Sequence, residues 1–516
     1  MPTKSCLTIP IFLAILAAGW THAQNTNTGA SANDWPMYAR DYTSARYSPL
    51  TELTPKNVTG LKQLCSYALP EPTVTFESSL VEIGGTLYFT SPASTYALDA
   101  TTCALKWSEK HDMPGNPGTV RGVAVEGRRL FRGFRDGYVI AYDLNNGEQL
   151  WATKLTAPDG RVANIAQSPL AWNGIVFIGT SGGEVNCACF VAALDAASGK
   201  VLWTFNTVPA PATAEAASWP KGVTPGGGSM WTSFSLDVPN GLLYLSTGNP
   251  GFDFADKYRP GANLYTNCVI ALDAKTGKLR TYYQIVPHDY HDWDLTSAPV
   301  VLTTKGGQQR VMVAGKDGHL VSIDPKARKI LWRTPVTTIE NTEAPLSPQG
   351  TRFCPGTAGG VEWNGPAYSP ATNLVYSNAV DRCSTVKDDP DYDGKKNMLG
   401  SANAFGDKDE NSAGWVTAID ADSGAVKWKY KASTPMVAGI AVTASGLVLT
   451  ADMASDFLAF DAANGKLLHR VKIGQPTGGG VITYSAGGRQ RIAVATGMEN
   501  RIMDTHGMPA IVVFGL

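Results

Sequence analysis

The chain has 516 residues, 43% of them hydrophobic and only 17% charged, so it is long enough to bury a large core. Its 43 Lys and Arg residues balance 44 Asp and Glu residues, and the formal net charge is −1. This balance argues against binding to nucleic acid or to an anionic membrane surface. The 53 Gly, 32 Pro and 13 Trp residues are typical of many turns and short strands, not of a helical bundle.

Residues 1–23 have the features of a secretory signal. Lys4 precedes an apolar run over residues 9–18, and Thr21-His22-Ala23 provides a cleavage site with small residues. The run is too short to span a bilayer, and no later stretch of about 18 apolar residues occurs. The alternative is a buried N-terminal strand. We expect export to the periplasm, cleavage after Ala23 and a single domain over residues 24–516.

One phrase, Ala-x-Asp followed by Gly and then Trp, recurs along the chain. Its aspartates are 41 to 52 residues apart, except for two longer intervals of 78 and 96 residues. The copies are centred on Asp99, Asp143, Asp195, Asp273, Asp324, Asp420 and Asp461. Each predicts a strand, a turn that uses the side chain of Asp and the positive φ of Gly, and a second strand ending in Trp.

Repeats of this length with several short strands predict the blades of a β-propeller. Seven copies are visible, and an eighth blade would form if the first and last strands paired and removed the exposed edge. We interpret the repeated Trp residues as packing between blades. Insertions over 209–228 and 388–411 occupy the long intervals, and such loops commonly lie on the functional face.

The repeated phrase resembles the tryptophan-docking repeat of the quinoprotein alcohol dehydrogenases, from Trp35 to near Leu516. That family holds pyrroloquinoline quinone (PQQ) at the centre of an eight-bladed all-β propeller. The opening Ala39-Arg40-Asp41 with Arg46-Tyr47-Ser48-Pro49-Leu50 is similar to its N-terminal signature. The resemblance implies oxidation of an alcohol, with electrons passed to a separate soluble cytochrome c, since the sequence contains no Cys-x-x-Cys-His motif for attached haem.

Three segments resemble those that carry the family's cation and catalytic residues. Gly179–Glu184 matches the segment whose glutamate binds the cation, and Ser246–Pro250 the segment whose asparagine is the second ligand. Pro287–Asp294 matches the catalytic segment, and an alignment without gaps places the catalytic aspartate at Asp292. Carboxylate and amide oxygens suit a hard cation, and a carboxylate suits a general base. Glu184 alone would be interpreted as a solvated loop residue.

The resemblance also implies residues that hold the cofactor. Arg121 matches the family's cofactor arginine and Glu77 its acidic partner, while Lys316 occupies the position that holds the quinone oxygens. Trp231 matches the tryptophan that forms the floor beneath the planar ring. The family's threonine contact falls on Ala166, so we assign the nearby Ser168 to the cofactor site.

Several positions depart from the family pattern. Gly115 and Asn116 stand where many members have adjacent cysteines that form a lid, and Val437 stands where they have a late tryptophan. Glu362-Trp363 replaces the usual Asn-Trp. These departures favour the polyvinyl-alcohol-dehydrogenase-like subgroup over the methanol dehydrogenases.

The identity of the cation depends on Asp294. Two residues after Asp292, it would point to the same side in an extended strand. The resemblance associates an aspartate at this place with lanthanide binding, but some calcium-dependent relatives have it too, and a supporting role hydrogen-bonded to a blade turn is the other interpretation. We predict Ca²⁺, with a lanthanide ion as the alternative.

Cysteine pairing is the last expectation for an exported chain. Family members with a similar Cys-Pro imply a disulfide between Cys354 and Cys383, and Cys65 with Cys103 is a plausible second bridge. Among Cys187, Cys189 and Cys268 at most one pair can form, and we favour a bridge to Cys268.

Two other functions stay open at this point. One is a non-catalytic periplasmic scaffold propeller of the outer-membrane assembly type, which has similar repeats but no reason to place Glu184, Asn249 and Asp292 in matching segments. The other, weaker alternative is a propeller hydrolase.

Overall fold

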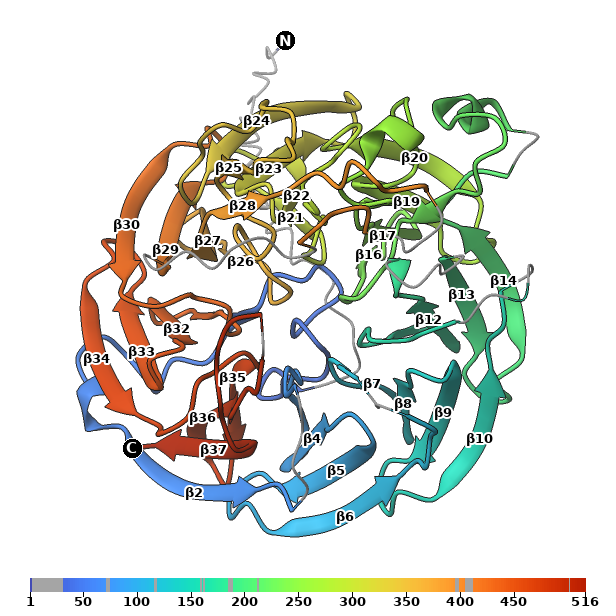
Figure 1. The fold of residues 1–516 in the computed structure, drawn as a ribbon. Coiled ribbons are helices and arrows are strands. Elements are labelled where there is room, and N and C mark those ends of the chain that lie inside the picture. Colours follow the sequence, from blue (N-terminus) through green and yellow to red (C-terminus); the bar gives the residue numbers. More distant parts are fainter. Residues whose placement is uncertain are drawn as a thin grey trace.

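The computed structural model is an all-β propeller of eight blades, as the sequence predicts. Its described residues are 1, 31–70, 75–115, 118–157, 160, 163–183, 189–210, 213–394, 399–403, 412–500 and 502–516. The predicted signal segment, apart from Met1, lies outside them. Figure 1 shows the sheets following one another in chain order around a central axis. No helix within the described ranges is long and apolar enough to cross a membrane.

Seven blades take their four strands in chain order, with the first strand nearest the axis and the last at the rim (Figure 1). Blades 1 to 3 are β3 (Val81–Ile83), β4 (Thr86–Thr90), β5 (Ser94–Asp99), β6 (Leu105–Lys110); β7 (Ala124–Glu126), β8 (Arg129–Gly133), β9 (Tyr138–Asp143), β10 (Gln149–Lys154); and β11 (Leu170–Trp172), β12 (Ile175–Gly179), β13 (Phe190–Asp195), β14 (Val201–Asn206). Blades 4 and 5 are β16 (Ser235–Asp237), β17 (Leu242–Ser246), β19 (Cys268–Asp273), β20 (Leu279–Gln284); and β21 (Val300–Thr303), β22 (Gln309–Ala314), β23 (His319–Asp324), β24 (Lys329–Pro335). Blades 6 and 7 are β26 (Ala367–Ser369), β27 (Leu374–Asp381), β29 (Ala413–Asp420), β30 (Val426–Ala432); and β31 (Ala441–Thr443), β32 (Leu447–Ala451), β33 (Asp456–Asp461), β34 (Leu467–Lys472).

The eighth blade closes the ring, as predicted. It combines β35 (Val481–Ala486), β36 (Arg489–Thr496) and β37 (Ala510–Gly515) with β2 (Lys62–Ala68) from the other end of the chain. The register of β2 on β37 runs from Lys62 opposite Gly515 to Ala68 opposite Ala510. This pairing removes the free edges that an open ring would expose.

The remaining elements are short. β1 (Tyr47–Ser48) pairs in parallel with β31, and two small hairpins pair β15 (Gly226–Gly227) with β18 (Pro250–Gly251) and β25 (Thr351–Phe353) with β28 (Ser384–Val386). Three 3₁₀ turns are described: η1 (Val58–Gly60), η3 (Ala214–Ser218) and η4 (Asp256–Tyr258). Within their described residues, the insertions therefore contribute little regular structure.

The repeated Trp residues join neighbouring blades, which confirms that they pack between blades. The indole nitrogens of Trp107, Trp151 and Trp428 donate to backbone carbonyls of the following blade at 3.1–3.2 Å. These three rings, and those of Trp203 and Trp332, each cover a turn glycine of the following blade, where a Cβ would lie within 3 Å of the indole. The covered glycines have positive φ and are Gly147, Gly199, Gly277, Gly424 and Gly465. Only glycine fits both the turn and the ring.

Two predicted disulfides are present, and one preferred bridge is wrong. Cys65 bonds to Cys103, and Cys354 bonds to Cys383. Cys268, which we expected to be bridged, is a free thiol. It is fully buried at the start of β19, and its Sγ donates to the carbonyl of Thr266 at 3.2 Å, so it is packed into its own blade. Cys187 lies outside the described residues.

We predict that Gly424→Ala destabilises the propeller more than Gly174→Ala. Both glycines have nearly the same φ, +74° and +77°, but a Cβ at Gly424 would lie 2.6 Å from Trp332, whereas a Cβ at Gly174 meets nothing within 4 Å. Gly174→Ala should cost about 1 kcal/mol for the left-handed backbone, and Gly424→Ala about 1–3 kcal/mol more for overpacking. Denaturant unfolding of both variants measures the difference. Equal losses would contradict docking of the indole as a stabilising contact.

Candidate functional site

A cavity of about 530 Å³ lies at the centre of the ring, where segments from different blades meet. Many of its polar side chains lie on the segments that lead into the innermost strands, so the propeller brings together residues that are far apart in the sequence. It is lined by Thr75, Glu77, Thr119, Arg121, Arg135, Asn164, Ile165, Ala166, Ser181, Gly182, Ser229, Trp231, Asp253, Asp292, Asp294, Lys316, Thr357, Ala358, Glu362, Trp363, Leu399, Asn500, Ile502 and Met503. Six residues expected from the sequence are among them: Glu77, Arg121, Trp231, Asp292, Asp294 and Lys316.

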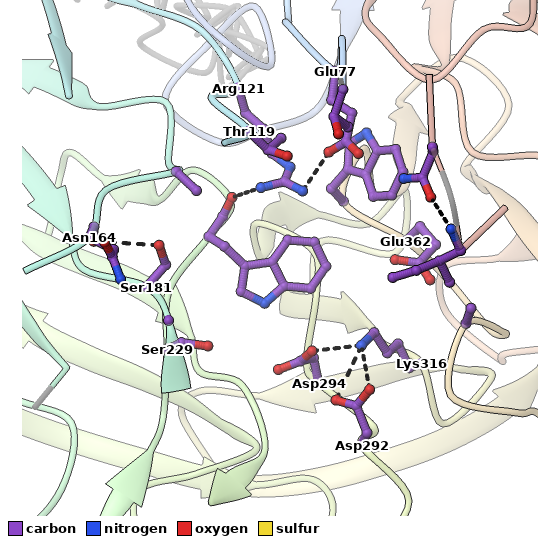
Figure 2. A pocket seen from close by; sticks show the side chains of 18 of the residues that line it. Glu77, Thr119, Arg121, Asn164, Ser181, Ser229, Asp292, Asp294, Lys316 and Glu362 are labelled. Atoms are coloured by element: carbon purple, nitrogen blue, oxygen red, sulfur yellow. Dashed lines mark hydrogen bonds and ion pairs between the residues drawn. The ribbon is translucent and has the colours of Figure 1, made fainter. Parts of the chain in front are cut away.

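One end of the cavity is formed by Arg121 and Glu77 (Figure 2). Arg121, just before β7, donates from Nη2 to Glu77 Oε2 at 2.5 Å and from Nη1 to the carbonyl of Trp231 at 3.1 Å. Burial raises the pKa of Glu77, and the positive charge of Arg121 opposes that shift. The guanidinium is thus fixed in place, with its face free to approach aromatic rings.

The other end is formed by Lys316 with two aspartates (Figure 2). Its Nζ lies 2.8 Å from Asp294 Oδ2 and 3.4 Å from both carboxylate oxygens of Asp292. Burial alone would lower the pKa of Lys316, but the carboxylates of Asp292, Asp294 and Glu362 outweigh it and hold the pKa well above its usual value. Lys316 is therefore a permanent positive charge in the cavity.

Trp231 lies between the two ends. Its ring is 4.6 Å from the guanidinium carbon of Arg121 and 5.7 Å from Lys316 Nζ, so both cations reach over the same indole. A second indole, Trp363, lies 5.3 Å from Arg121 and is anchored by a 2.7 Å hydrogen bond from its Nε1 to the carbonyl of Gly478. The arrangement suits a flat, negatively charged group lying on an aromatic floor between two cations.

Asp292 and Asp294 do not lie in an extended strand, contrary to our expectation. β21 begins only at Val300, and Asp292 has a φ of +63°, in the left-handed region. Both side chains nevertheless contact Lys316, from the loop that precedes β21. Asp294 is engaged on both oxygens, since Oδ1 also accepts the backbone N–H of Asn249 at 3.1 Å.

The other expected residues are placed around the cavity in different ways. Asn249 is buried beside Asp294, but it is not among the lining residues. Ser168 lies behind the wall, where its hydroxyl donates to the carbonyl of Val123 at 3.1 Å, and Ala166 faces the cavity instead. Glu184 lies outside the described residues, as does Asn116. Val437 packs in an apolar cluster with Trp363.

Sequence reasoning recognised Glu362 as a departure but missed it as a site residue. Its carboxyl points into the space between the two ends of the cavity (Figure 2). Burial raises its pKa to about 7; Lys316 and Arg121 act against the shift, while Asp294 and Glu77 add to it. Asp253 and Ser229 were also missed, because both lie in loops that the repeat does not describe. The signal that could have identified Glu362 is its position next to Trp363, in the pair that replaces the usual Asn-Trp.

Comparison with known proteins places this arrangement in a family. Residues 35–333 match the glucose/ethanol/alcohol dehydrogenase β-propeller domain. The dehydrogenase subunit of the quinone alcohol dehydrogenase of Gluconacetobacter polyoxogenes is 30% identical over an alignment that covers 95% of this chain and 77% of that protein. The chain belongs to the PQQ-dependent alcohol dehydrogenase family. It is therefore an enzyme, of the quinoprotein alcohol dehydrogenase class.

Other relatives agree with this assignment. The quinohemoprotein alcohol dehydrogenase ADH IIB of Pseudomonas putida is 28% identical, with 95% of this chain and 77% of that protein covered. The fold matches the crystal structure of quinohemoprotein alcohol dehydrogenase from Comamonas testosteroni, with a TM-score of 0.85 at 24% identity over 94% of this chain and 81% of that one. A europium-containing methanol dehydrogenase has the same fold, with a TM-score of 0.83 at 24% identity over 94% of this chain and 98% of that one. Residues 412–501 also match the outer membrane protein assembly factor BamB.

We predict that Glu362→Gln changes how stability depends on pH. Because the pKa of Glu362 is about 7 in the folded protein and near 4.5 in a solvated chain, the folded state keeps a proton that the unfolded state loses. Wild-type stability should therefore fall between pH 4.5 and pH 7 by on the order of 3 kcal/mol relative to the glutamine variant. Denaturant unfolding of both proteins without cofactor at pH 5 and pH 8 measures the change. Parallel stabilities at the two pH values would contradict a buried, neutral carboxyl.

Proposed function

We propose that the protein is a periplasmic enzyme that oxidises an alcohol to an aldehyde or ketone with PQQ and a bound cation. The supporting observation is the cavity in which Arg121 and Lys316 reach over Trp231 while Asp292 lies beside Lys316. Within the PQQ-dependent family this combination meets the needs of the cofactor and of the alcohol in one place.

The residues present fit PQQ, a planar group with several carboxylates. Trp231 offers a flat apolar face, and Arg121 and Lys316 offer charge at two separated points. Glu77 restrains Arg121, and Ser168 supports the wall through Val123. When bound, PQQ supplies a quinone carbonyl, polarised by the cation acting as a Lewis acid, which accepts hydride from the alcohol.

Asp292 is proposed as the general base that takes the proton of the alcohol hydroxyl. It lines the cavity, and it is only 8% exposed, so a substrate proton has few competing water molecules. A general base has to be ionised beforehand, and the positive charge of Lys316 at 3.4 Å favours the ionised form. In this proposal Asp292 accepts the proton, and the positive charge of Lys316 stabilises negative charge beside it.

The cation is proposed to be Ca²⁺, held by Glu184, Asn249 and Asp292. Carboxylate and amide oxygens are the ligands that Ca²⁺ prefers. Asp294, the residue that would add negative charge for a lanthanide ion, already accepts from the Asn249 N–H and pairs with Lys316. That engagement favours a supporting role for Asp294, and lanthanide binding remains the alternative.

Several finer features complete the proposal. The N-terminal residues resemble a secretory signal, which supports the periplasm. The sequence has no Cys-x-x-Cys-His motif, which supports a separate soluble cytochrome c as electron acceptor; one relative is named 1-butanol dehydrogenase (cytochrome c). Gly115 and Val437 support the polyvinyl-alcohol-dehydrogenase-like subgroup. A scaffold role is not favoured, because it gives no reason for a buried lysine paired with two aspartates.

Asp292→Asn should bind PQQ but lose turnover. Asparagine tolerates the left-handed backbone at this position, so the fold should survive, while loss of the proton acceptor should lower kcat by about 10²–10⁴-fold. The assay reconstitutes wild type and variant with PQQ and Ca²⁺ and follows dye reduction with a panel of primary, secondary and polymeric alcohols. PQQ binding, measured by quenching of tryptophan fluorescence, is the control. Near-wild-type turnover of the variant would remove Asp292 from the mechanism.

The choice of cation can be tested by metal removal. After chelation, the enzyme with PQQ should regain turnover with Ca²⁺ and not with La³⁺. Asp294→Asn keeps one acceptor oxygen for the Asn249 N–H and should retain the affinity for Ca²⁺ within about tenfold, since Asp294 acts outside the ligand set. Titration calorimetry with each metal gives the affinities. Turnover only with La³⁺, abolished in Asp294→Asn, would establish the lanthanide alternative.

A further inference from the structure

The proposed general base is held in an unusual backbone conformation. Asp292 has a φ of +63° and the nearby His288 a φ of +54°, in the region that residues other than glycine seldom occupy. Such a conformation costs about 1–3 kcal/mol and persists only where surrounding contacts impose it. The contacts that impose it therefore decide where the carboxylate of Asp292 points.

Asp289 supplies contacts on both sides of Asp292. Its Oδ1 accepts the backbone N–H of His291 at 3.0 Å, and its Oδ2 accepts the backbone N–H of Trp293 at 2.8 Å. These are the residues immediately before and after Asp292, so one buried carboxylate fixes both neighbours of the base. The Trp293 ring is held further by its Nε1 bond to the carbonyl of Pro355 at 3.1 Å and by stacking on His291 at 3.9 Å.

Arg259 connects this turn to the insertion that follows β18. Its fully buried guanidinium donates to the carbonyl of Asp289, to the carbonyls of Phe252 and Asp253 at 3.0 Å each, and to Asn263 Oδ1 at 3.0 Å. Burial lowers the pKa of Arg259 to about 10, with Asp289, Asp253 and Asp256 opposing the shift, so it stays charged at neutral pH. Asp253 also lines the cavity.

We propose that Arg259 and Asp289 are positioning residues that set the direction of the Asp292 carboxylate and tie it to the cavity wall at Asp253. The proposal rests on the function proposed for Asp292. Neither residue lines the cavity, so neither is expected to touch the alcohol or PQQ. Their effect is on the approach of the base to the reacting proton, where a displacement of about 1 Å can cost about 10²-fold in rate.

The test uses the full-length chain in four variants. Asp289→Ala removes both acceptors, and Asp289→Asn keeps one. Arg259→Lys keeps the charge but loses the fork of donors. Arg132→Lys is the matched control, because Arg132 is also fully buried and donates to the backbone carbonyls of Ser91 and Pro92, and none of these three residues lines the cavity.

Three measurements separate positioning from general loss of structure. With PQQ and Ca²⁺, Asp289→Ala and Arg259→Lys should lower kcat by about 10–100-fold with KM and PQQ affinity changed less than threefold, and Asp289→Asn should recover part of the loss. Without cofactor, hydrogen exchange of residues 287–294 should accelerate in Asp289→Ala and Arg259→Lys. Arg132→Lys should lower the Tm as much as Arg259→Lys does, yet leave kcat and this exchange unchanged.

Each outcome decides the proposal. Wild-type kcat in Asp289→Ala, or equal kcat losses in Arg259→Lys and Arg132→Lys, would overturn it. Unchanged exchange of residues 287–294 in Asp289→Ala would overturn it as well, even in protein that binds no PQQ. If wild type itself neither binds PQQ nor turns over alcohol, the proposed function fails instead, while accelerated exchange still shows that Asp289 and Arg259 hold the turn.

Discussion

Docking of each rim tryptophan on a glycine of the next blade is the contact on which the site depends. Arg121, Trp231 and Lys316 precede or follow strands of blades 2, 4 and 5, and no sheet hydrogen bond joins one of these blades to another among the described strands. Their spacing is therefore set by how neighbouring blades pack. A tightly packed interface admits only one orientation, so five tryptophan-on-glycine contacts and the β2–β37 closure fix the angles at which the inner segments approach the axis. A rotation of one blade would separate the two cations from their shared indole.

Much of this fold could be predicted because the information is local and repeated. Asp99 and Asp420 accept backbone N–H groups two or three residues ahead, which is the turn that the Asp-to-Gly phrase predicts. The eighth blade followed from the need to remove sheet edges. Whether Cys268 forms a disulfide could not be predicted from the repeat, because pairing depends on the face of β19 to which the thiol points. The thiol is free and buried within the blade.

The site was predictable only where a short motif carries the residue. Arg121, Asp292 and Lys316 lie in recognisable segments and do reach the cavity. Arg259 and Asp253 lie between β18 and β19, where the repeat is interrupted. The hydrogen bonds of Arg259 to the carbonyls of Phe252 and Asp289 could not be predicted, because these two residues come together only in the folded chain. Asp292 and Asp294 lie outside any strand, and the Asp289 carboxylate accepts backbone N–H groups on both sides of Asp292. Such a side-chain contact does not follow from an alternation rule for strands.

The two aspartates on either side of Trp293 show how environment separates groups of equal chemistry. Asp294 is 2% exposed. Its Oδ2 lies 2.8 Å from Lys316 Nζ and its Oδ1 accepts the Asn249 N–H, so both oxygens are engaged by groups of the protein. Asp292 is more exposed, at 8%, and its oxygens lie 3.4 Å from the same lysine, at the long limit of a hydrogen bond. Lys316 is thus held more closely by Asp294 than by Asp292. That asymmetry, together with the place of Asp292 on the cavity wall, supports the roles proposed for the two residues, with Asp292 in the chemistry and Asp294 as a supporting group.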